Sequence, residues 1–276
     1  MMVAIELHNR LMRSRNIKII YVLIALLMTY FGSWLPDFDH VVGVESAIIS
    51  STAVFGPLNG MLLGPYLGGM VTFVGISAHF ITSPERLGYH TFFLISPLYV
   101  VISSVVAGFI IRRKERIALL IYTSLIFLWY LLDAGREVFY YPWFHIAILI
   151  LFLLVRTRLW DNARGIGFHT FAILLMTSVI AALSDHMAGS IMAQILLDIP
   201  VDAYSAVIFI YPIERFILAF VAALVMYLLI SIIYSSFMHI HLVEDITDNS
   251  KKRKLCDYIR KDVKKMLEEE SEKKKK

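Results

Sequence analysis

The sequence predicts an all-α protein, a polytopic bundle of about eight helices that cross a membrane. Hydrophobic residues make up 58% of the 276 residues and charged residues only 17%, and the mean hydropathy is +0.70. Several apolar runs approach the length of about 20 residues that spans the hydrocarbon core. These runs are continuous rather than alternating, which indicates helices.

The chain divides into a cytoplasmic N-terminal segment of residues 1–18, a transmembrane helical domain of residues 19–238 and a charged cytoplasmic tail of residues 239–276. The net charge of +4 does not indicate nucleic-acid binding, because lysines and glutamates are interleaved in the tail as on a solvated surface. Basic residues beside a span instead favour contact with anionic membrane lipid. The single cysteine, Cys256, excludes an internal disulfide.

The first four spans are predicted from the positions of prolines, glycines and charges. The first apolar run follows basic residues and lacks a small-residue cleavage site, so we expect it to be retained, and it ends at Pro36. A tight turn at Gly56-Pro57 separates the second and third spans, and Pro65 breaks or kinks the third. These spans are residues 19–35, 46–56, 60–80 and 91–111.

Small residues recur at every fourth position in the stretch of residues 53–80, at Gly56, Gly60, Gly64 and Gly68. On a helix this spacing forms a smooth stripe that a neighbouring backbone can approach closely. We therefore expect helix packing or contact with a partner subunit along this stripe, and not a solute pocket.

The last four spans are separated by polar and basic loops. DAGREVFYYPW follows the fifth span, RTRLWDNARG follows a short sixth span, and the seventh is continuous. The eighth begins at Pro212, a residue type that suits the first turn of a helix. These spans are residues 117–132, 143–155, 168–197 and 212–238.

Basic residues set the predicted orientation, because Lys and Arg in short loops mark the cytoplasmic face. The N-terminal segment, residues 112–116, residues 156–164 and the tail all fall on one side, so both termini are expected in the cytoplasm. Six aromatic residues lie near the opposite face, and we interpret most of them as an interfacial belt rather than a stacking site: Trp34, Tyr140, Tyr141, Trp143, Tyr204 and Tyr211.

Polar residues inside the seventh span form the most informative candidate site. Charge within a membrane is costly and usually faces a cavity or a partner. Asp185 and Gly189 share a helix face, with His186 beside it, and Gln194 follows. This face could line a pocket open to the outer side; alternatively, Asp185 and His186 lie at the interface, where water reaches them.

The outer start of the last span carries two further charges. Glu214 lies in the first turn, where it complements the positive end of the helix. Adjacent side chains on a helix point in different directions, so Arg215 requires a partner elsewhere. We hypothesise that this partner is Asp185 or a substrate anion.

Asp37, Asp39 and His40 form a third cluster. Two carboxylates and a histidine could ligate a metal, but a solvated loop is the favoured interpretation, and we expect no metal, cofactor or catalytic residue. The sequence contains neither GxxxxGK[ST] nor HExxH. Any role driven by ATP therefore requires another subunit.

The stretch FGPLNGMLLGPYLGG, after the apolar run of residues 43–54, resembles the signature region of the substrate-binding S-components of energy-coupling factor transporters. SPLYVVISSVVAGFIIRRK is similar to the family's helix that ends in a basic cytoplasmic stub. SDHMAGS and YPIERFILAFVAALV are similar to the last two helices of archaeal members. The resemblance implies an S-component-like core of six helices, into which residues 117–155 insert two more.

The resemblance also implies a binding subunit, not an enzyme, that captures a vitamin, a precursor or a related small solute from outside the cell membrane. A transmembrane coupling subunit and two cytosolic ATPases would energise uptake. Ala25 and Thr29 approximate the family's small-xxx-small motif for the coupling subunit. The implied substrate-binding residues are Asp185, His186, Gly189, Gln194, Glu214 and Arg215, with Asp37 and His40 on a lid loop.

Two other functions are alternatives. A membrane-bound metal-dependent hydrolase would use Asp37, Asp39 and His40, because LPDFDH resembles the acidic-histidine motif of one such family. That family adds an early histidine on the same side of the membrane, whereas His8 is expected on the side opposite His40. A proton-coupled carrier would use Asp185 and His186, and its uptake would need a pH gradient but no ATPase.

Overall fold

The computed structural model describes residues 15–35, 51–83, 91–163 and 165–246. These residues form helices joined by short turns, with no strand among them, which confirms the all-α class. The chain divides into two compact units, residues 1–230 and residues 231–276. The features discussed below belong to the first unit.

The long helices coincide with predicted spans to within a few residues at most ends. They are α2 (Arg15–Gly32), α4 (Pro65–Thr82), α5 (Thr91–Ile111), α6 (Glu115–Leu131), α8 (Trp143–Asn162), α9 (Phe168–Leu197) and α11 (Ile210–Ile246). Shorter elements are the 3-10 turn η1 (Ser51–Val54), α3 (Phe55–Leu63), α7 (Asp133–Glu137) and α10 (Val201–Ala206). The predicted tail is helical up to Ile246, and the residues after it lie outside the described ranges.

Within the described ranges, 4 helices are long and apolar enough to cross a membrane. Their apolar segments are Leu94–Ile111, Trp143–Asn162, Phe168–Leu197 and Ile210–Ser235, and Asn16–Gly32 is a shorter apolar helix. The larger number of spans and the six-helix core stay predictions.

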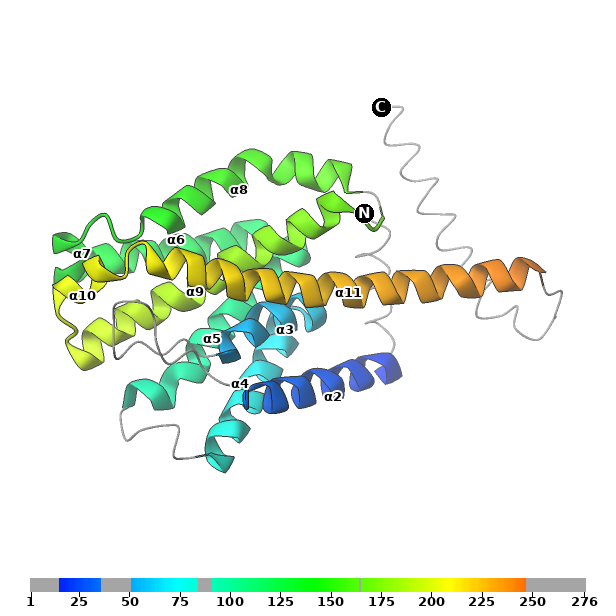
Figure 1. The fold of residues 1–276 in the computed structure, drawn as a ribbon, viewed down its shortest axis with the longest axis horizontal. Coiled ribbons are helices and arrows are strands. Elements are labelled where there is room, and N and C mark those ends of the chain that lie inside the picture. Colours follow the sequence, from blue (N-terminus) through cyan, green and yellow to red (C-terminus); the bar gives the residue numbers. More distant parts are fainter. Residues whose placement is uncertain (1–14, 36–50, 84–90, 164, 247–276) are drawn as a thin grey trace. The chain divides into compact units, whose positions relative to one another are not determined.

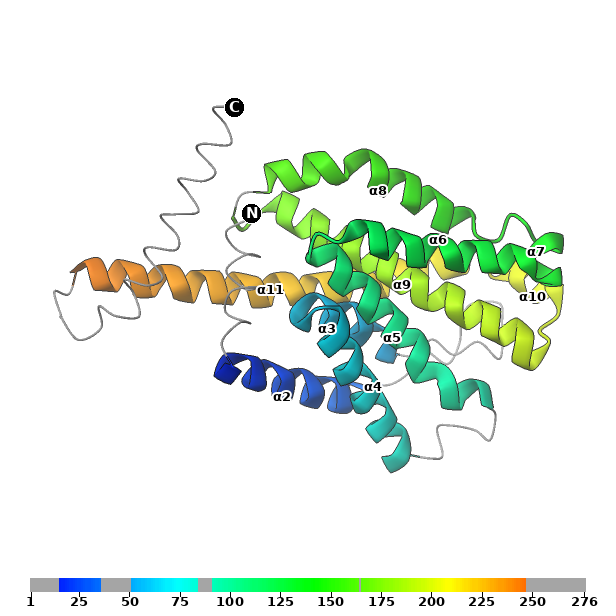
Figure 2. The same cartoon turned by 180° about the vertical axis from the view of Figure 1, so that it is seen from behind.

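α5 and α9 form the centre of the first unit, where they run side by side (Figure 1). On its other faces α5 packs against α3 and α4, and Figure 2 shows these elements from behind. Side chains along both central helices are fully buried, such as Ala107 and Ile110 on α5 and Ile180 and Leu183 on α9. This packing holds the polar residues of α9 inside the bundle.

The predicted turn at Gly56-Pro57 was wrong. Pro57 lies in the first turn of α3, where its missing N–H costs little. The chain instead breaks at Gly64, whose φ of +86° is a conformation that side chains other than glycine rarely adopt. Pro65 then begins α4. The glycine–proline pair that turns the chain is therefore the second one.

The glycine stripe packs against the chain's own helices. A Cβ added to Gly56 would lie 2.8 Å from the Val100 carbonyl oxygen, and one added to Gly60 would overlap the Ser104 carbonyl of α5. A Cβ on Gly68 would meet the Asn59 carbonyl oxygen at 2.5 Å, so the stripe also brings α3 close to α4. Gly64 faces the guanidinium of Arg112 at the end of α5.

Ala25 and Thr29, the two positions of the small-xxx-small motif, are also buried within the chain. Thr29 lies where a Cβ on Gly75 of α4 would be, and its Oγ1 accepts a hydrogen bond of 2.8 Å from Asn59 Nδ2. Thr29 therefore contacts α3 and α4 of the same chain.

Candidate functional site

Asp185 on α9 and Arg215 on α11 form an ion pair. Asp185 is one of the two partners that we hypothesised for Arg215. Nη1 of Arg215 lies 3.0 Å from Oδ2 of Asp185, and the side chains are only 17% and 9% exposed, respectively. Burying two charges away from water costs free energy, because each charge loses its hydration. The pair therefore places two opposite charges inside the helical bundle.

His186, the next residue on α9, points in a different direction from Asp185 because successive residues on a helix are about 100° apart. Its ring stacks on the Tyr211 ring, with centroids 4.5 Å apart and planes at 15°. On another side it stacks with the fully buried His145, at 5.5 Å and 24°. α8, α9 and α11 thus each contribute a ring to this stack.

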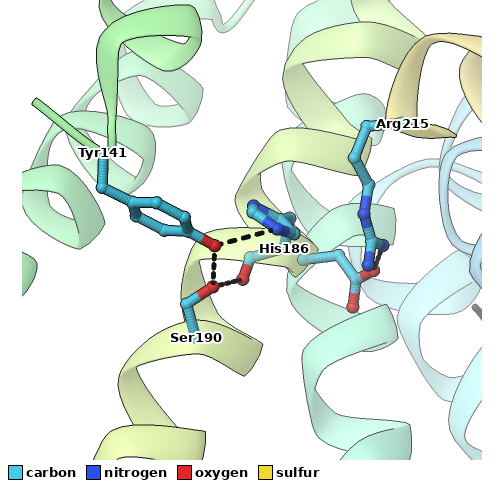
Figure 3. Close-up of polar contacts among 5 residues, drawn as sticks. Tyr141, His186, Ser190 and Arg215 are labelled. Carbon is cyan, nitrogen blue, oxygen red and sulfur yellow. Dashed lines mark hydrogen bonds and ion pairs between the residues drawn. The ribbon is translucent and has the colours of Figure 1, made fainter. Parts of the chain in front are cut away.

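Hydroxyl groups connect His186 to the turn before α8 (Figure 3). The Tyr141 hydroxyl lies 3.3 Å from His186 Nε2 and 3.1 Å from Ser190 Oγ. Ser190 lies one turn after His186 and donates a hydrogen bond of 2.9 Å to its carbonyl oxygen. Burial raises the pKa of Tyr141 to about 12, so its hydroxyl keeps its proton at neutral pH.

Other aromatic residues enclose this group. Tyr211 donates its hydroxyl proton to the Tyr141 carbonyl oxygen at 2.8 Å. The Trp129 ring lies 4.9 Å from the rings of both Tyr141 and Tyr204, and the Tyr204 hydroxyl donates to the Ser190 carbonyl. We call Tyr141, His145, His186, Ser190 and Tyr211 the ring cluster.

The interpretation of the outer aromatic residues as one interfacial belt was wrong for half of them. Tyr141, Tyr204 and Tyr211 are buried, whereas Trp34, Tyr140 and Trp143 are exposed as a belt requires. Hydropathy alone cannot separate the two groups, because a tyrosine suits both a wet interface and a hydrogen-bonded interior. Helix rotation makes the difference.

His145 is a member of the ring cluster that the sequence interpretation missed. A signal was present, because a histidine in the apolar run of residues 143–155 is unusual inside a membrane span. Tyr141 and His145 are also four residues apart, the spacing of one helix face. Neither signal identifies His186 as the neighbour.

The remaining predicted site residues within the described ranges are Gly189, Glu214 and Gln194. Gly189 is on the Asp185 face, where an added Cβ would lie 3.8 Å from the Tyr99 ring. Glu214 is half-buried and its charge acts on Tyr141. Gln194 bonds with Asp198 at 3.5 Å, near the end of α9.

Asp37, Asp39 and His40 lie outside the described residues. Among the residues that are described, no group of three or more His, Cys, Asp or Glu side chains is arranged to hold a metal ion. A hydrolase site on the first loop therefore stays a prediction.

The two internal basic loops lie together. The Arg113 guanidinium stacks 4.1 Å from the Trp160 ring, and Arg156 pairs with Glu115 at 3.0 Å. These contacts join the α5–α6 turn to the last part of α8, and α7 and α10 lie at the opposite end of the helices (Figure 1). This separation is the one that the predicted orientation requires.

The chain has a distant relative in sequence. The chain is 25% identical over 219 residues to an uncharacterized protein of Methanocaldococcus jannaschii, an alignment that covers 79% of this chain and 72% of that protein. No family model matches the chain, and no solved structure matches it. The description of the relative names no activity, so the function is argued from the site.

Proposed function

We propose that this chain is a membrane-embedded binding subunit that captures a small solute for uptake. The observation that carries the proposal is the Asp185–Arg215 pair, held inside long apolar helices beside the ring cluster. Ionisable residues within a membrane domain commonly mark a solute or ion pathway. Stability alone does not explain two buried charges, since apolar side chains of similar volume often stabilise a protein at least as well.

The chemistry of the site suits a polar molecule that contains a ring. The rings of His186, Tyr211 and His145, stacked on one another, supply an aromatic surface beside the pair, and Arg215 and Asp185 supply a charged donor and a charged acceptor. A vitamin, a vitamin precursor or a related micronutrient has this combination.

The proposed orientation follows from the basic loops. Arg113 and Arg156 would face the cytoplasm, and α7 and α10 would face the outside. Solute would reach the ring cluster from the side of α7 and α10, because Tyr141 and Tyr204 lie in or next to these elements.

Release to the inside would depend on partners. By the resemblance to S-components of energy-coupling factor transporters, a transmembrane coupling subunit and two cytosolic ATPases would drive it. A second candidate, a proton-coupled carrier, is favoured by the position of Asp185 and His186 at adjacent residues of one buried helix.

Mass spectrometry of small molecules released from the purified protein tests the binding function. We expect the wild type to carry one organic solute and Arg215→Ala to carry much less. Arg156→Ala is the matched control, because it also removes an arginine that pairs with a carboxylate at 3.0 Å. Equal solute in all three proteins, or none in any, would overturn the proposal.

Uptake measurements in vesicles then separate the two energy sources. Transport that requires co-purifying ATPases and ATP supports the binding subunit. Transport by the chain alone that follows an imposed pH gradient supports the carrier instead.

A further inference from the structure

The hydrogen-bond donors around Tyr141 can be assigned one by one. Ser190 has a single hydroxyl proton, which it donates to the His186 carbonyl oxygen. Ser190 Oγ must therefore accept from the Tyr141 hydroxyl, at 3.1 Å. This uses the single proton of Tyr141, so the remaining contact, at 3.3 Å, requires that His186 Nε2 carries a proton and donates it to the Tyr141 oxygen.

The assignment fixes the tautomer of His186. A neutral imidazole carries one ring proton, and with that proton on Nε2 the other nitrogen, Nδ1, is a bare acceptor. A second ring proton would add a positive charge in an apolar interior, which is unfavourable. Tyr141 and Ser190 thus act as positioning residues for the His186 ring.

Several atoms at this place lack a hydrogen-bond partner among the described residues, including both ring nitrogens of His145 and two atoms beside the ion pair. The two beside the ion pair are His186 Nδ1, an acceptor, and Arg215 Nε, a donor, and both are enclosed by the protein. Buried polar atoms are nearly always paired in native structures. An acceptor and a donor are therefore left available on the facing helices α9 and α11.

We propose that the solute presents a hydrogen-bond donor to His186 Nδ1 and a neighbouring acceptor to Arg215 Nε, as the edge of a ring with an N–H beside a C=O does. This inference deepens the proposed function and rests on it for the role of the site in uptake. Its ligand chemistry is tested without any transport measurement.

The first experiment is nitrogen NMR on detergent-solubilised protein labelled with ¹⁵N-histidine. We expect His186 to show a protonated Nε2 and a bare Nδ1. In Ser190→Ala the Tyr141 proton becomes free to donate to Nε2, so the population should shift toward the tautomer protonated at Nδ1, and Ser190→Thr should restore the original one. Tyr140→Phe is the matched control and should leave the signal unchanged, because the Tyr140 hydroxyl contacts Ser205.

The second experiment uses two named probes, 2-pyridone and N-methyl-2-pyridone. They share a ring and a carbonyl group, but only 2-pyridone has the N–H. Loss of one hydrogen bond to a buried acceptor corresponds to about a tenfold difference in affinity, so we expect the methylated probe to bind about tenfold more weakly. 2-Pyridone should also shift the Nδ1 signal of His186 and the Nε signal of ¹⁵N-labelled Arg215.

Three results would overturn the inference. They are a His186 ring protonated at Nδ1 in the wild type, equal affinity for the two probes, and probe binding that leaves both nitrogen signals in place. The last two results would fit a water molecule, or a side chain outside the described residues, that already satisfies both atoms. Failure of ATP-driven uptake with normal probe discrimination would overturn the proposed function and leave the ligand pattern standing.

Discussion

At the scale of single residues, the balance between charge and burial decides the behaviour of the site. Asp185 and Arg215 are each more than four-fifths buried, so neither charge is well screened by solvent. Arg136 and Asp133 also form an ion pair, but their side chains are 67% and 86% exposed, respectively. Solvent screens the exposed pair, so the two pairs should differ in energetic weight.

Arg215→Ala should lower the free energy of unfolding by about 3 kcal/mol or more, because it leaves the Asp185 carboxylate buried without its partner. Arg136→Ala should cost only about 0–1 kcal/mol, because its pair with Asp133 is exposed to solvent. Thermal unfolding of the two purified variants in the same detergent measures the difference. Equal destabilisation would show that burial does not set the weight of the Asp185–Arg215 pair.

Exchange of the two charges tests the pairing itself. Asp185→Arg and Arg215→Asp should each be severely destabilising, and the double variant should recover part of the lost stability because opposite charges again face each other. A double variant no more stable than the worse single variant would contradict a direct interaction.

At the scale of elements, close contact between helices depends on residues without large side chains. α3 approaches α5 at Gly56 and Gly60, and a buried amide joins α2, α3 and α4. Asn59 Nδ2 lies 2.8 Å from Thr29 Oγ1 and 3.0 Å from Thr72 Oγ1. Small residues and interhelical hydrogen bonds are the main sources of helix association where lipid removes the hydrophobic driving force.

Gly60→Ala should destabilise the protein by about 1–3 kcal/mol, because the new methyl group overlaps the Ser104 carbonyl and forces α3 away from α5. Gly69→Ala is the control on α4. Its Cβ would contact Val101 of α5 at 3.4 Å, an ordinary van der Waals distance. Melting temperatures of the two variants should differ clearly, and a harmless Gly60→Ala would mean that the interface tolerates separation.

Asn59→Ala should cost about 1 kcal/mol, since an interhelical hydrogen bond inside a membrane contributes roughly 0.6 kcal/mol and two are lost. Asn162→Ala is the comparison, because Asn162 is exposed and bonds only within its own helix, to the Arg158 carbonyl. Denaturant titration in mixed micelles measures both variants. A loss no larger for Asn59→Ala than for Asn162→Ala would remove Asn59 from the account of helix association.

At the scale of the whole molecule, the charges predict which end faces the cytoplasm. Arg158 lies near the end of α8 with the basic loops, and Asp202 lies on α10 at the opposite end, and both are exposed. The N-terminal segment carries further basic residues. The distribution agrees with the positive-inside rule if α10 lies outside.

Cysteine labelling in intact cells tests this orientation after Cys256→Ser removes the only native thiol. A membrane-impermeant thiol reagent should modify Asp202→Cys in intact cells and Arg158→Cys only after permeabilisation. The reverse pattern would invert the orientation and place the ring cluster near the cytoplasmic face.

The sequence by itself determined the class of the protein and the position of most helices, because apolar length and the placement of proline and charge are properties of a local stretch. It also identified Asp185 and Arg215 as residues that need partners, since the cost of a charge in an apolar run does not depend on the fold. The sequence contains two glycine–proline pairs, and only the fold shows that the second, Gly64-Pro65, is the one at which the chain breaks.

Only the tertiary structure decided which helix faces meet. Rotation of α8 and α11 buries Tyr141, His145 and Tyr211 around His186, whereas Tyr140 and Trp143, in the same stretch, stay exposed. The glycine stripe likewise met α5 of its own chain. Such pairings depend on the rotation of every helix at once, so no single stretch of sequence contains them.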